Sequence, residues 1–359
     1  MYTKKNYTIK RMLSWTRRYI FMFVLLSTVP VVLYEVLDWK WLYLPWLPIG
    51  LIGTALAFII GFKNNASYGR LWEARKIYGG IVNASRLLAS MVNDFITNEH
   101  TLKNRTDAEF FKIKKAMIMR HIAWMTALRH ALRVKKPWET TANNKSDQEV
   151  MRKLHIQEYA FSLEEELEGY LNDKEKEIVL RKTNKQTAVL NLQSKAIKEL
   201  KLEGLIDDFR HMEFKNMIGE LFTLQGKAER IKNFPYPRQF ATLNLFFAWI
   251  FVALLPFGLM NEFEKIGLAL VNTNITGNIS QIIAENFVWL TIPFSVIISW
   301  IFFTMERIGD VSENPFEGIA NDVPITTISR GIEIDIREMI DDHKNEIPEP
   351  HPEYEYTQM

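Results

Sequence analysis

Apolar residues are gathered in four blocks of this chain, and each block is long enough to cross a lipid bilayer as a helix. A transmembrane helix needs roughly 20 predominantly apolar residues. The four blocks cover residues 19–37, 41–62, 240–260 and 287–305. Charged residues fill most of the remaining chain, which is why the mean hydropathy of the whole sequence is close to neutral. The pattern predicts four transmembrane helices.

The segment between the second and third blocks is polar overall, yet its apolar residues recur at helical spacing. In residues 68–95 and 106–134 they stand three and four positions apart, as on one face of a helix. The expected helices of this segment cover residues 68–95, 106–134, 156–170, 174–202 and 206–231. Residues 135–150 are polar and rich in turn-forming residues, so they predict a linker. No alternation typical of strands persists, so we expect an all-α fold.

Lysine and arginine near the ends of the blocks predict the orientation, because these residues are enriched in cytosolic loops. On one side of the membrane they are Lys4, Lys5, Lys10, Arg11, Arg17, Arg18, Lys63, Arg70, Arg75, Lys76, Arg230, Lys232 and Arg238. The two loops on the other side carry only Lys40 and Lys265. We therefore expect a multi-pass protein of the inner (cytoplasmic) membrane with both termini in the cytosol. Two glycosylation sequons, at Asn274 and Asn278, are interpreted as chance matches to a short pattern.

These observations divide the chain into six expected segments. They are a cytosolic N-terminal segment 1–18, transmembrane helices 19–62, a cytosolic helical region 63–237, transmembrane helices 238–305, a cytosolic segment 306–340 and a tail 341–359. The tail is rich in Pro and Glu and is predicted to be disordered. The expected fold class is thus an all-α membrane protein with four transmembrane helices and a large cytosolic helical region.

The sequence offers little that resembles catalytic chemistry. It has no cysteine, and it contains no HExxH, GxSxG, P-loop or GxGxxG motif. The seven histidines are scattered, and the net charge of +2 gives no reason to expect binding to nucleic acid. We therefore expect no catalytic residue, no bound metal and no cofactor, and we do not expect an enzyme.

The second apolar block has two possible interpretations. Thr54, Phe58 and Phe62 are spaced by four residues and so lie on one helix face. Small residues stand between them, at Gly53, Ala55, Ala57 and Gly61. Small residues allow membrane helices to pack closely, and periodicity alone favours this interpretation. The alternative is that this face lines a narrow pore, since hydrophobic constrictions can gate a channel by losing water.

Two further runs of residues resemble the bestrophin family of ion channels, including its bacterial members. The first is GFKNNASYGRLWEARKIYGGIV, residues 61–82, and the second is Asn314-Pro315-Phe316, followed by Asn321-Asp322-Val323-Pro324. The order of elements is similar too: two spans, a long helical insert, two spans and then the Asn-Pro-Phe segment. The resemblance covers roughly residues 8 to 335.

The resemblance implies a homopentamer with one central pore. Its neck positions fall on Thr54, Phe58 and Phe62, although Thr54 departs from the family norm of three bulky apolar residues. A second, cytosolic constriction falls on Met212, with Phe209 as the next candidate. In animal members, acids that follow Asn-Pro-Phe hold calcium, but here only Asp322 matches such a ligand. Calcium prefers six to eight oxygen ligands, so we expect no calcium site.

The sequence thus predicts a passively conducting ion channel, with an anion such as chloride as the permeant ion by family analogy. Its expected partners are permeant inorganic ions, further copies of itself and the lipid bilayer, but not nucleic acid. Two alternatives remain: a monovalent cation channel of the same fold, and a membrane-anchored signalling or interaction protein that does not conduct.

Overall fold

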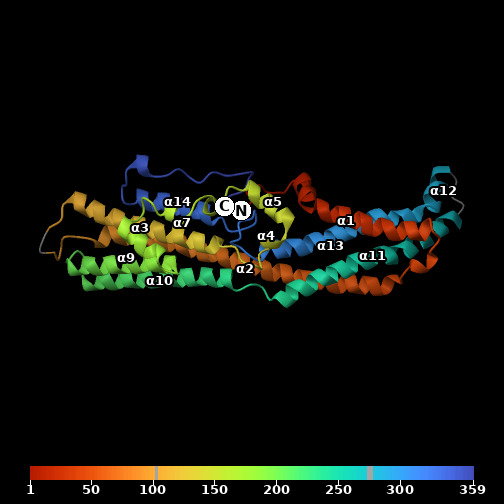
Figure 1. Cartoon of the computed structure of the whole chain (residues 1–359), viewed down its shortest axis with the longest axis horizontal. Coiled ribbons are helices and arrows are strands. Elements are labelled where there is room, and N and C mark those ends of the chain that lie inside the picture. The colour runs from red at the N-terminus through yellow and green to blue at the C-terminus, as the bar shows by residue number, and fades with distance from the viewer. Residues whose placement is uncertain (102–103, 273–277) are drawn as a thin grey trace. The chain divides into compact units, whose positions relative to one another are not determined.

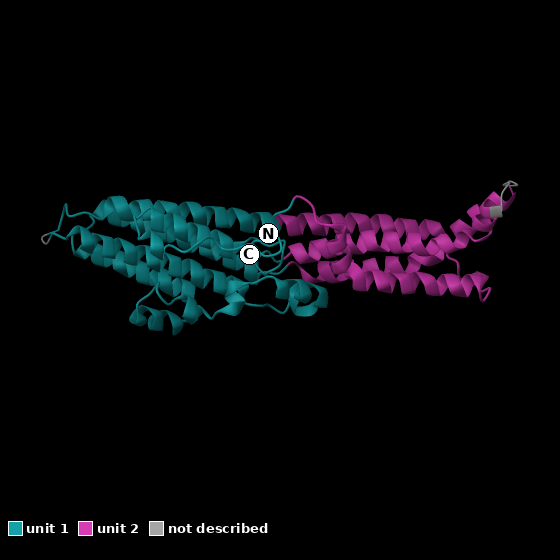
Figure 2. Ribbon diagram, turned by 90° about the horizontal axis from the view of Figure 1, so that it is seen from above, with its two compact units in different colours: residues 1–4, 70–235, 314–359 teal, residues 5–69, 236–313 magenta. Residues whose placement is uncertain are grey.

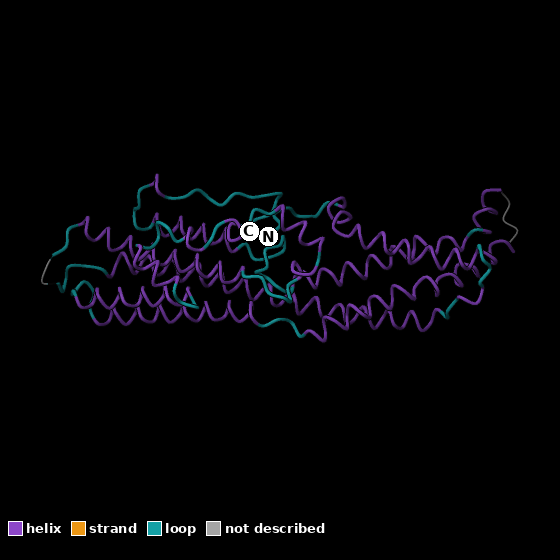
Figure 3. Tube along the Cα trace, in the orientation of Figure 1, coloured by secondary structure: helices purple, strands orange, loops and turns teal. Residues whose placement is uncertain are grey.

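The computed structural model describes all residues except 102–103 and 273–277, so the sequon at Asn274 lies outside the described residues. Within the described part, regular structure is helical, and the backbone forms isolated bridges rather than strands (Figure 3). This confirms the all-α prediction. The chain forms two compact units (Figure 2). Unit 1 contains Met1–Lys4, Arg70–Pro235 and Asn314–Met359, and unit 2 contains Lys5–Gly69 and Tyr236–Glu313.

Unit 2 is built from long apolar helices. They are α1 (Ile9–Glu35), the first part of α2 (Trp46–Phe95), α11 (Arg238–Asn272) and α13 (Thr291–Ser312). Helices α1 and α11 both pack along α13 (Figure 1). The short helices η1 (Lys40–Leu42), α12 (Asn278–Glu285) and η2 (Phe287–Leu290) complete the unit. By length and composition, four stretches can each cross a membrane, which confirms the four predicted spans.

The outer surface of unit 2 is apolar as well as its interior. Buried residues such as Phe23, Val252 and Phe303 form small clusters between the helices. Large apolar side chains also remain exposed, among them Phe21 at 67% and Phe246 at 57%. Such a surface is unfavourable in water, because burying apolar area drives association, but it suits a hydrocarbon environment.

Helix α2 is longer than the sequence analysis predicted. It runs for 50 residues without interruption, whereas separate helices were predicted for residues 41–62 and 68–95. The polar residues at the join are accommodated because their side chains find partners on α13. The ammonium group of Lys63 pairs with Glu306, and the Asn64 amide donates to the Met305 carbonyl at 3.1 Å. Polar residues in an apolar helix therefore do not end it here.

Unit 1 packs the rest of α2 with four other helices of more than 13 residues around one large apolar core (Figure 1). These helices are α3 (Asp107–Arg133), α9 (Lys185–Leu202), α10 (Asp208–Asn233) and α14 (Ile325–Glu338). Their starts follow local sequence signals. Thr106 and Glu109 form a capping box at the start of α3, and Asn184 and Asp207 cap α9 and α10.

Shorter elements differ from the prediction. They are α4 (Thr140–Asn143), α5 (Lys145–Lys153), α6 (Gln157–Ala160), α7 (Leu163–Glu166) and α8 (Asp173–Leu180). The predicted linker 135–150 therefore contains helical turns. The single helix predicted for 174–202 is divided, because the Asn184 side chain accepts from the Thr187 amide at 2.9 Å and starts a new helix.

The C-terminal tail, which its composition predicts to be disordered, has defined contacts in this structure. It contains the short helix η3 (Lys344–Glu346), and Met359 is buried beside Leu154 and Ile156. The Thr327 amide donates to the Met359 carbonyl at 2.6 Å. Average composition misses this because a few apolar side chains and backbone bonds hold the tail.

Candidate functional site: the exposed face of α2

The three predicted neck residues lie on an exposed face of α2 in unit 2. Phe58 is 67% exposed and Phe62 is 71% exposed, and Thr54 is also exposed. The Thr54 hydroxyl donates to the Gly50 carbonyl at 3.0 Å, so its proton is used within the helix. The described part of the chain leaves most of both phenylalanine side chains uncovered. They are therefore available to line a pore, to contact another subunit or to face lipid.

A groove of about 810 Å³ runs along this face. Its lining residues are Trp46, Gly50, Gly53, Thr54, Ala57, Phe58, Gly61, Phe62, Asn65, Phe251, Ile298 and Phe302. The last three belong to α11 and α13 and form one side of the groove. The groove is mostly apolar, and no carboxylate or ammonium group is found among the described residues that line it. An ion in it would lose hydration without gaining a strong ligand.

The small residues of α2 have two different surroundings. A Cβ atom added at Gly53 would lie 2.7 Å from the Phe251 ring, so this glycine permits close packing of α2 against α11. At Gly61 an added Cβ would meet nothing within 4 Å. The packing interpretation of the sequence therefore holds at Gly53, but it does not explain the uncovered side chains of Phe58 and Phe62.

Met212 and Phe209 lie in unit 1, in the first two turns of α10. Met212 is 61% exposed and Phe209 is 83% exposed. They are three residues apart, so they lie on the same helix face. Large apolar side chains at the exposed end of a helix outside the spans are unusual for a water-facing surface. Their role in a second constriction remains a prediction.

The two runs that carry the family resemblance meet inside unit 1. Phe316 of the Asn-Pro-Phe segment is 1% exposed, and its ring centroid lies 5.9 Å from that of Tyr78. Tyr78 belongs to the run 61–82, and it is buried too. Residues more than 230 positions apart in the sequence thus form one packing contact. The Asn-Pro-Phe segment is held by the core of this unit.

Asp322 is the one acid that matches a calcium ligand of the family. Its carboxylate is already engaged by other groups of this chain. Its carboxylate accepts from the Gly318 amide at 2.6 Å and the Ile319 amide at 3.3 Å. The Arg133 guanidinium lies 3.5 Å away. Burial raises the pKa of Asp322 to about 6, although Arg133 and the two amides act in the opposite direction. Gly318 has φ of +101°, a conformation that favours glycine, so the turn around the carboxylate is specific.

Glu317 is buried beside Asp322 and is also bonded within the chain. The Thr140 hydroxyl lies 3.2 Å from its carboxylate, and the Thr141 amide donates to it. Burial raises the pKa of Glu317 to about 7; Thr141 opposes this, and Asp322 and Glu139 add to the rise. In the described residues no group of three or more His, Cys, Asp or Glu side chains is arranged to hold a metal ion.

The family described as "Bacterial/Fungal Bestrophin protein" matches residues 11–275 and 281–338. The chain belongs to the bestrophin family. Among curated proteins, this bestrophin is 29% identical over 294 residues to the voltage-dependent anion channel-forming protein RSc3414 of Ralstonia nicotianae, covering 82% of this chain and 76% of that protein. It is 23% identical over 295 residues to the voltage-dependent anion channel-forming protein YneE of Escherichia coli K12, covering 82% of this chain and 77% of that protein.

Among solved structures, this bestrophin is similar to the bacterial bestrophin homolog from Klebsiella pneumoniae. The TM-score is 0.69 at 22% sequence identity, over 90% of this chain and 98% of that chain. At this identity the likeness shows the fold. It agrees with the order of elements from which the resemblance was inferred.

Sequence reasoning missed the buried charged residues of this bestrophin. Arg129 and Arg133 are 6% and 1% exposed, and both contact Glu158. Although burial opposes its ionisation, these two arginines lower the pKa of Glu158 to about 2. A signal was present: the two arginines stand four residues apart on α3, a helix whose neighbouring positions are apolar. Their acidic partners come from distant segments, which spacing alone cannot identify.

Proposed function

We propose that this protein is an anion channel that conducts passively through the central pore of a homopentamer. The observation that carries the proposal is the uncovered face of α2. Thr54, Phe58 and Phe62 are exposed, and the same face stays exposed at the polar residue Asn65 and at Gly69. A face turned to lipid would be expected to remain apolar, whereas a pore face can pass from an apolar constriction to a wet, polar entrance.

The family assignment and the names of the relatives support this proposal. RSc3414 and YneE are both called voltage-dependent anion channel-forming proteins, and neither name describes an enzyme. The lining of the groove gives a physical reason in the same direction. Its described lining residues include no carboxylate to attract a cation, and aromatic rings carry a positive edge that favours an anion when it points toward the ion.

In this proposal the rings of Phe58 and Phe62 from five chains form a narrow apolar neck, and Met212 forms a second constriction on the cytosolic side. The protein lies in the inner membrane, with both termini in the cytosol. Phe58 and Phe62 act as a gate more than as a filter, because an apolar ring is difficult to wet and offers an ion no strong ligand.

Ion flux from liposomes that contain the purified protein tests this function. We expect chloride efflux above that of empty liposomes, and a reversal potential in asymmetric salt that follows the chloride gradient. A potential that follows the cation gradient would favour the cation channel. No flux from correctly assembled protein would favour a membrane anchor. Native mass spectrometry of the detergent-solubilised protein tests the five-chain stoichiometry separately.

A further inference from the structure

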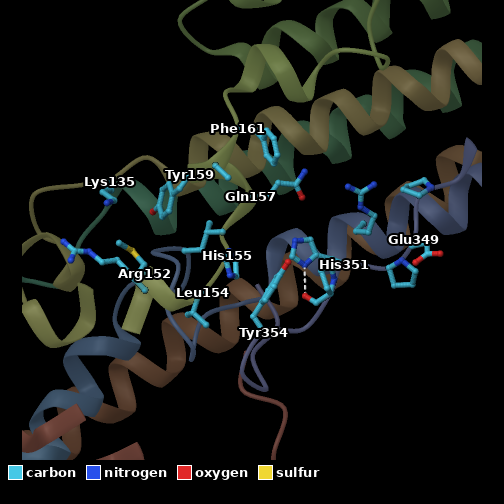
Figure 4. A pocket seen from close by; sticks show the side chains of 17 residues that line it. Lys135, Arg152, Leu154, His155, Gln157, Tyr159, Phe161, Glu349, His351 and Tyr354 are labelled. Atoms are coloured by element: carbon cyan, nitrogen blue, oxygen red, sulfur yellow. Dashed lines mark hydrogen bonds between the residues drawn. The ribbon is translucent and has the colours of Figure 1, made fainter. Parts of the chain in front are cut away.

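A cavity of about 780 Å³ lies in unit 1, and none of the predicted pore residues is among the residues that line it. One wall consists of most of the residues between 151 and 161, and the other consists of residues 348–352 and Tyr354 of the C-terminal tail (Figure 4). Lys135, just after α3, and Arg330, on α14, complete the lining. Ligand pockets in proteins typically measure about 300–1,000 Å³, so the cavity is large enough for a small organic molecule.

The lining carries an excess of positive charge. Lys135, Arg152 and Arg330 contribute cations, while Glu349 is the one acid among the described residues that line the cavity. Arg330 is already paired with Glu333 at 3.0 Å. Arg152 is exposed and makes no hydrogen bond or ion pair with the described part of the chain. A guanidinium group that is not engaged can bind a phosphate or carboxylate through two parallel hydrogen bonds.

Aromatic rings stand beside these cations. Tyr159 is 40% exposed and Phe161 is 54% exposed, and both line the cavity. The Lys135 ammonium lies 5.0 Å from the centre of the Tyr159 ring. On the tail side, Tyr354 contacts His155 with ring centroids 4.4 Å apart. Figure 4 shows Lys135, Arg152 and Tyr159 on one side of the view, with His155 and Tyr354 near its middle. Exposed rings of this kind provide flat surfaces on which a planar ring can stack.

Both walls are held in place without a ligand. The Tyr159 hydroxyl lies 3.1 Å from the Arg133 carbonyl and 3.0 Å from the Glu317 carbonyl. Leu154 and Ile156 are buried and contact Met359. The tail segment that lines the cavity contains Pro348, Pro350 and Pro352, whose rings fix their backbone φ angles. A cavity with ordered walls loses little entropy when it binds, which favours affinity.

We propose that this cavity binds a small molecule that combines a planar aromatic ring with an acidic group, either a phosphate or a carboxylate. The acidic group binds Lys135 and Arg152, and the ring stacks beside Tyr159 and Phe161. Because the Tyr159 hydroxyl donates to the Glu317 carbonyl, one hydrogen bond links the ring that the ligand contacts to the segment that follows the fourth span.

Calorimetric titration of the purified full-length protein in detergent tests the proposal. The probes are phenyl phosphate, benzoate and adenosine 5′-monophosphate, with inorganic phosphate and adenosine as the separate halves of the last one. We expect saturable binding of at least one ring-bearing acid, tighter than either half. Comparing phenyl phosphate with benzoate distinguishes a phosphate from a carboxylate. If none of the three ring-bearing acids binds saturably, the proposal is wrong.

Variants show whether binding uses the cavity. Arg152→Ala and Lys135→Ala should each weaken binding about tenfold, the size expected for one lost charge-assisted hydrogen bond. The matched control is Lys153→Ala, which removes the same charge from the next residue, outside the lining. Phe161→Leu should weaken the binding of adenosine 5′-monophosphate more than that of inorganic phosphate. Equal losses from Arg152→Ala and Lys153→Ala would show general surface attraction and overturn the proposal. We also expect these variants to show the same chloride flux as the wild type. A loss of ligand binding can then be distinguished from a loss of channel function.

Discussion

The ammonium group of Lys63 and the carboxylate of Glu306 form an ion pair buried between α2 and α13 in unit 2. Their side chains are 1% and 2% exposed. Asp310 lies 3.8 Å from the same ammonium group, and Arg307 pairs with Asp310. Lys63 directly follows Phe62, the last predicted neck residue. The pair therefore fixes α2 to α13 immediately beside the proposed gate.

Breaking this pair should destabilise the protein strongly. Glu306→Ala leaves the ammonium group of Lys63 buried, with only the more distant Asp310 near it, and losing one partner of a buried pair costs about 3–5 kcal/mol. We expect a large fall in the apparent unfolding temperature in detergent, measured by intrinsic fluorescence. The double variant Lys63→Met, Glu306→Leu should recover most of the loss, because no buried charge remains. A double variant as unstable as Glu306→Ala would contradict this account.

Truncating the neck should make conduction easier. Phe62→Ala widens the proposed ring and eases its wetting, so chloride flux per channel should rise, with little change in the reversal potential. The matched control is Phe21→Ala on α1, whose ring is 67% exposed compared with 71% for Phe62. This control should leave the flux unchanged. If Phe62→Ala assembles normally and conducts no more than the control, the residue is not part of the gate.

The stability of the protein should fall as the pH rises, because of Glu317. Its pKa is raised from 4.5 to about 7, mainly by burial, so the folded protein holds this proton more tightly than the unfolded chain. Its contribution to stability is fully present below pH 4.5 and is lost as the pH rises through about 7. Asp322, with its pKa raised from 3.8 to about 6, acts in the same direction.

Glu317→Gln tests this pH dependence, since the amide resembles the protonated carboxyl group and can still accept from the Thr141 amide. We expect the apparent unfolding temperature of the wild type to decline as the pH rises from 4.5 through about 7. The decline should be about 2–4 °C for each kcal/mol of stability lost. The variant should show a smaller decline. An identical slope in both proteins would mean that Glu317 does not titrate in this range.

Calcium should not open the channel. The carboxylate of Asp322 already accepts two backbone hydrogen bonds and faces Arg133, so it is poorly placed to bind a cation. We expect the same chloride flux with micromolar calcium as with a chelator. Asp322→Ala should lower stability, because it leaves the Gly318 amide and the buried arginine without this acceptor. A calcium-dependent rise in flux that disappears in Asp322→Ala would refute the prediction.

Labelling of introduced cysteines can test the orientation, because the natural chain has none. In intact cells, an impermeant maleimide should react at Lys265→Cys and Lys40→Cys and not at Lys185→Cys. Lys265 is a suitable position because its side chain is 61% exposed. After the cells are permeabilised, Lys185→Cys should react too, which shows that the site is accessible. Reaction at Lys185→Cys in intact cells would reverse the proposed topology.

The parts of the fold that depend on local signals could be predicted from the sequence. The four spans follow from apolar length alone, and the helix predicted for 106–134 from the spacing of its apolar residues agrees closely with α3 (Asp107–Arg133). The exposure of Phe58 and Phe62 could not be predicted, since helical spacing shows which residues share a face but not what covers it. The partner of Lys63 could not be found either, because Glu306 is 243 positions away. Likewise, the composition of the tail gave no indication that Met359 is buried.

Phe62 and Lys63 are consecutive residues on one continuous helix, and this has a consequence for evolution. Successive residues of an α-helix are separated by about 100° around its axis. The buried lysine thereby sets the direction in which the adjacent phenylalanine points. Gain or loss of a single codon between Thr54 and Lys63 would rotate the preceding neck residues by that angle relative to the buried Lys63. Most substitutions on the neck face would cause no such rotation. Among homologues that conserve the ion pair, alignments of this stretch should therefore contain substitutions but no gaps.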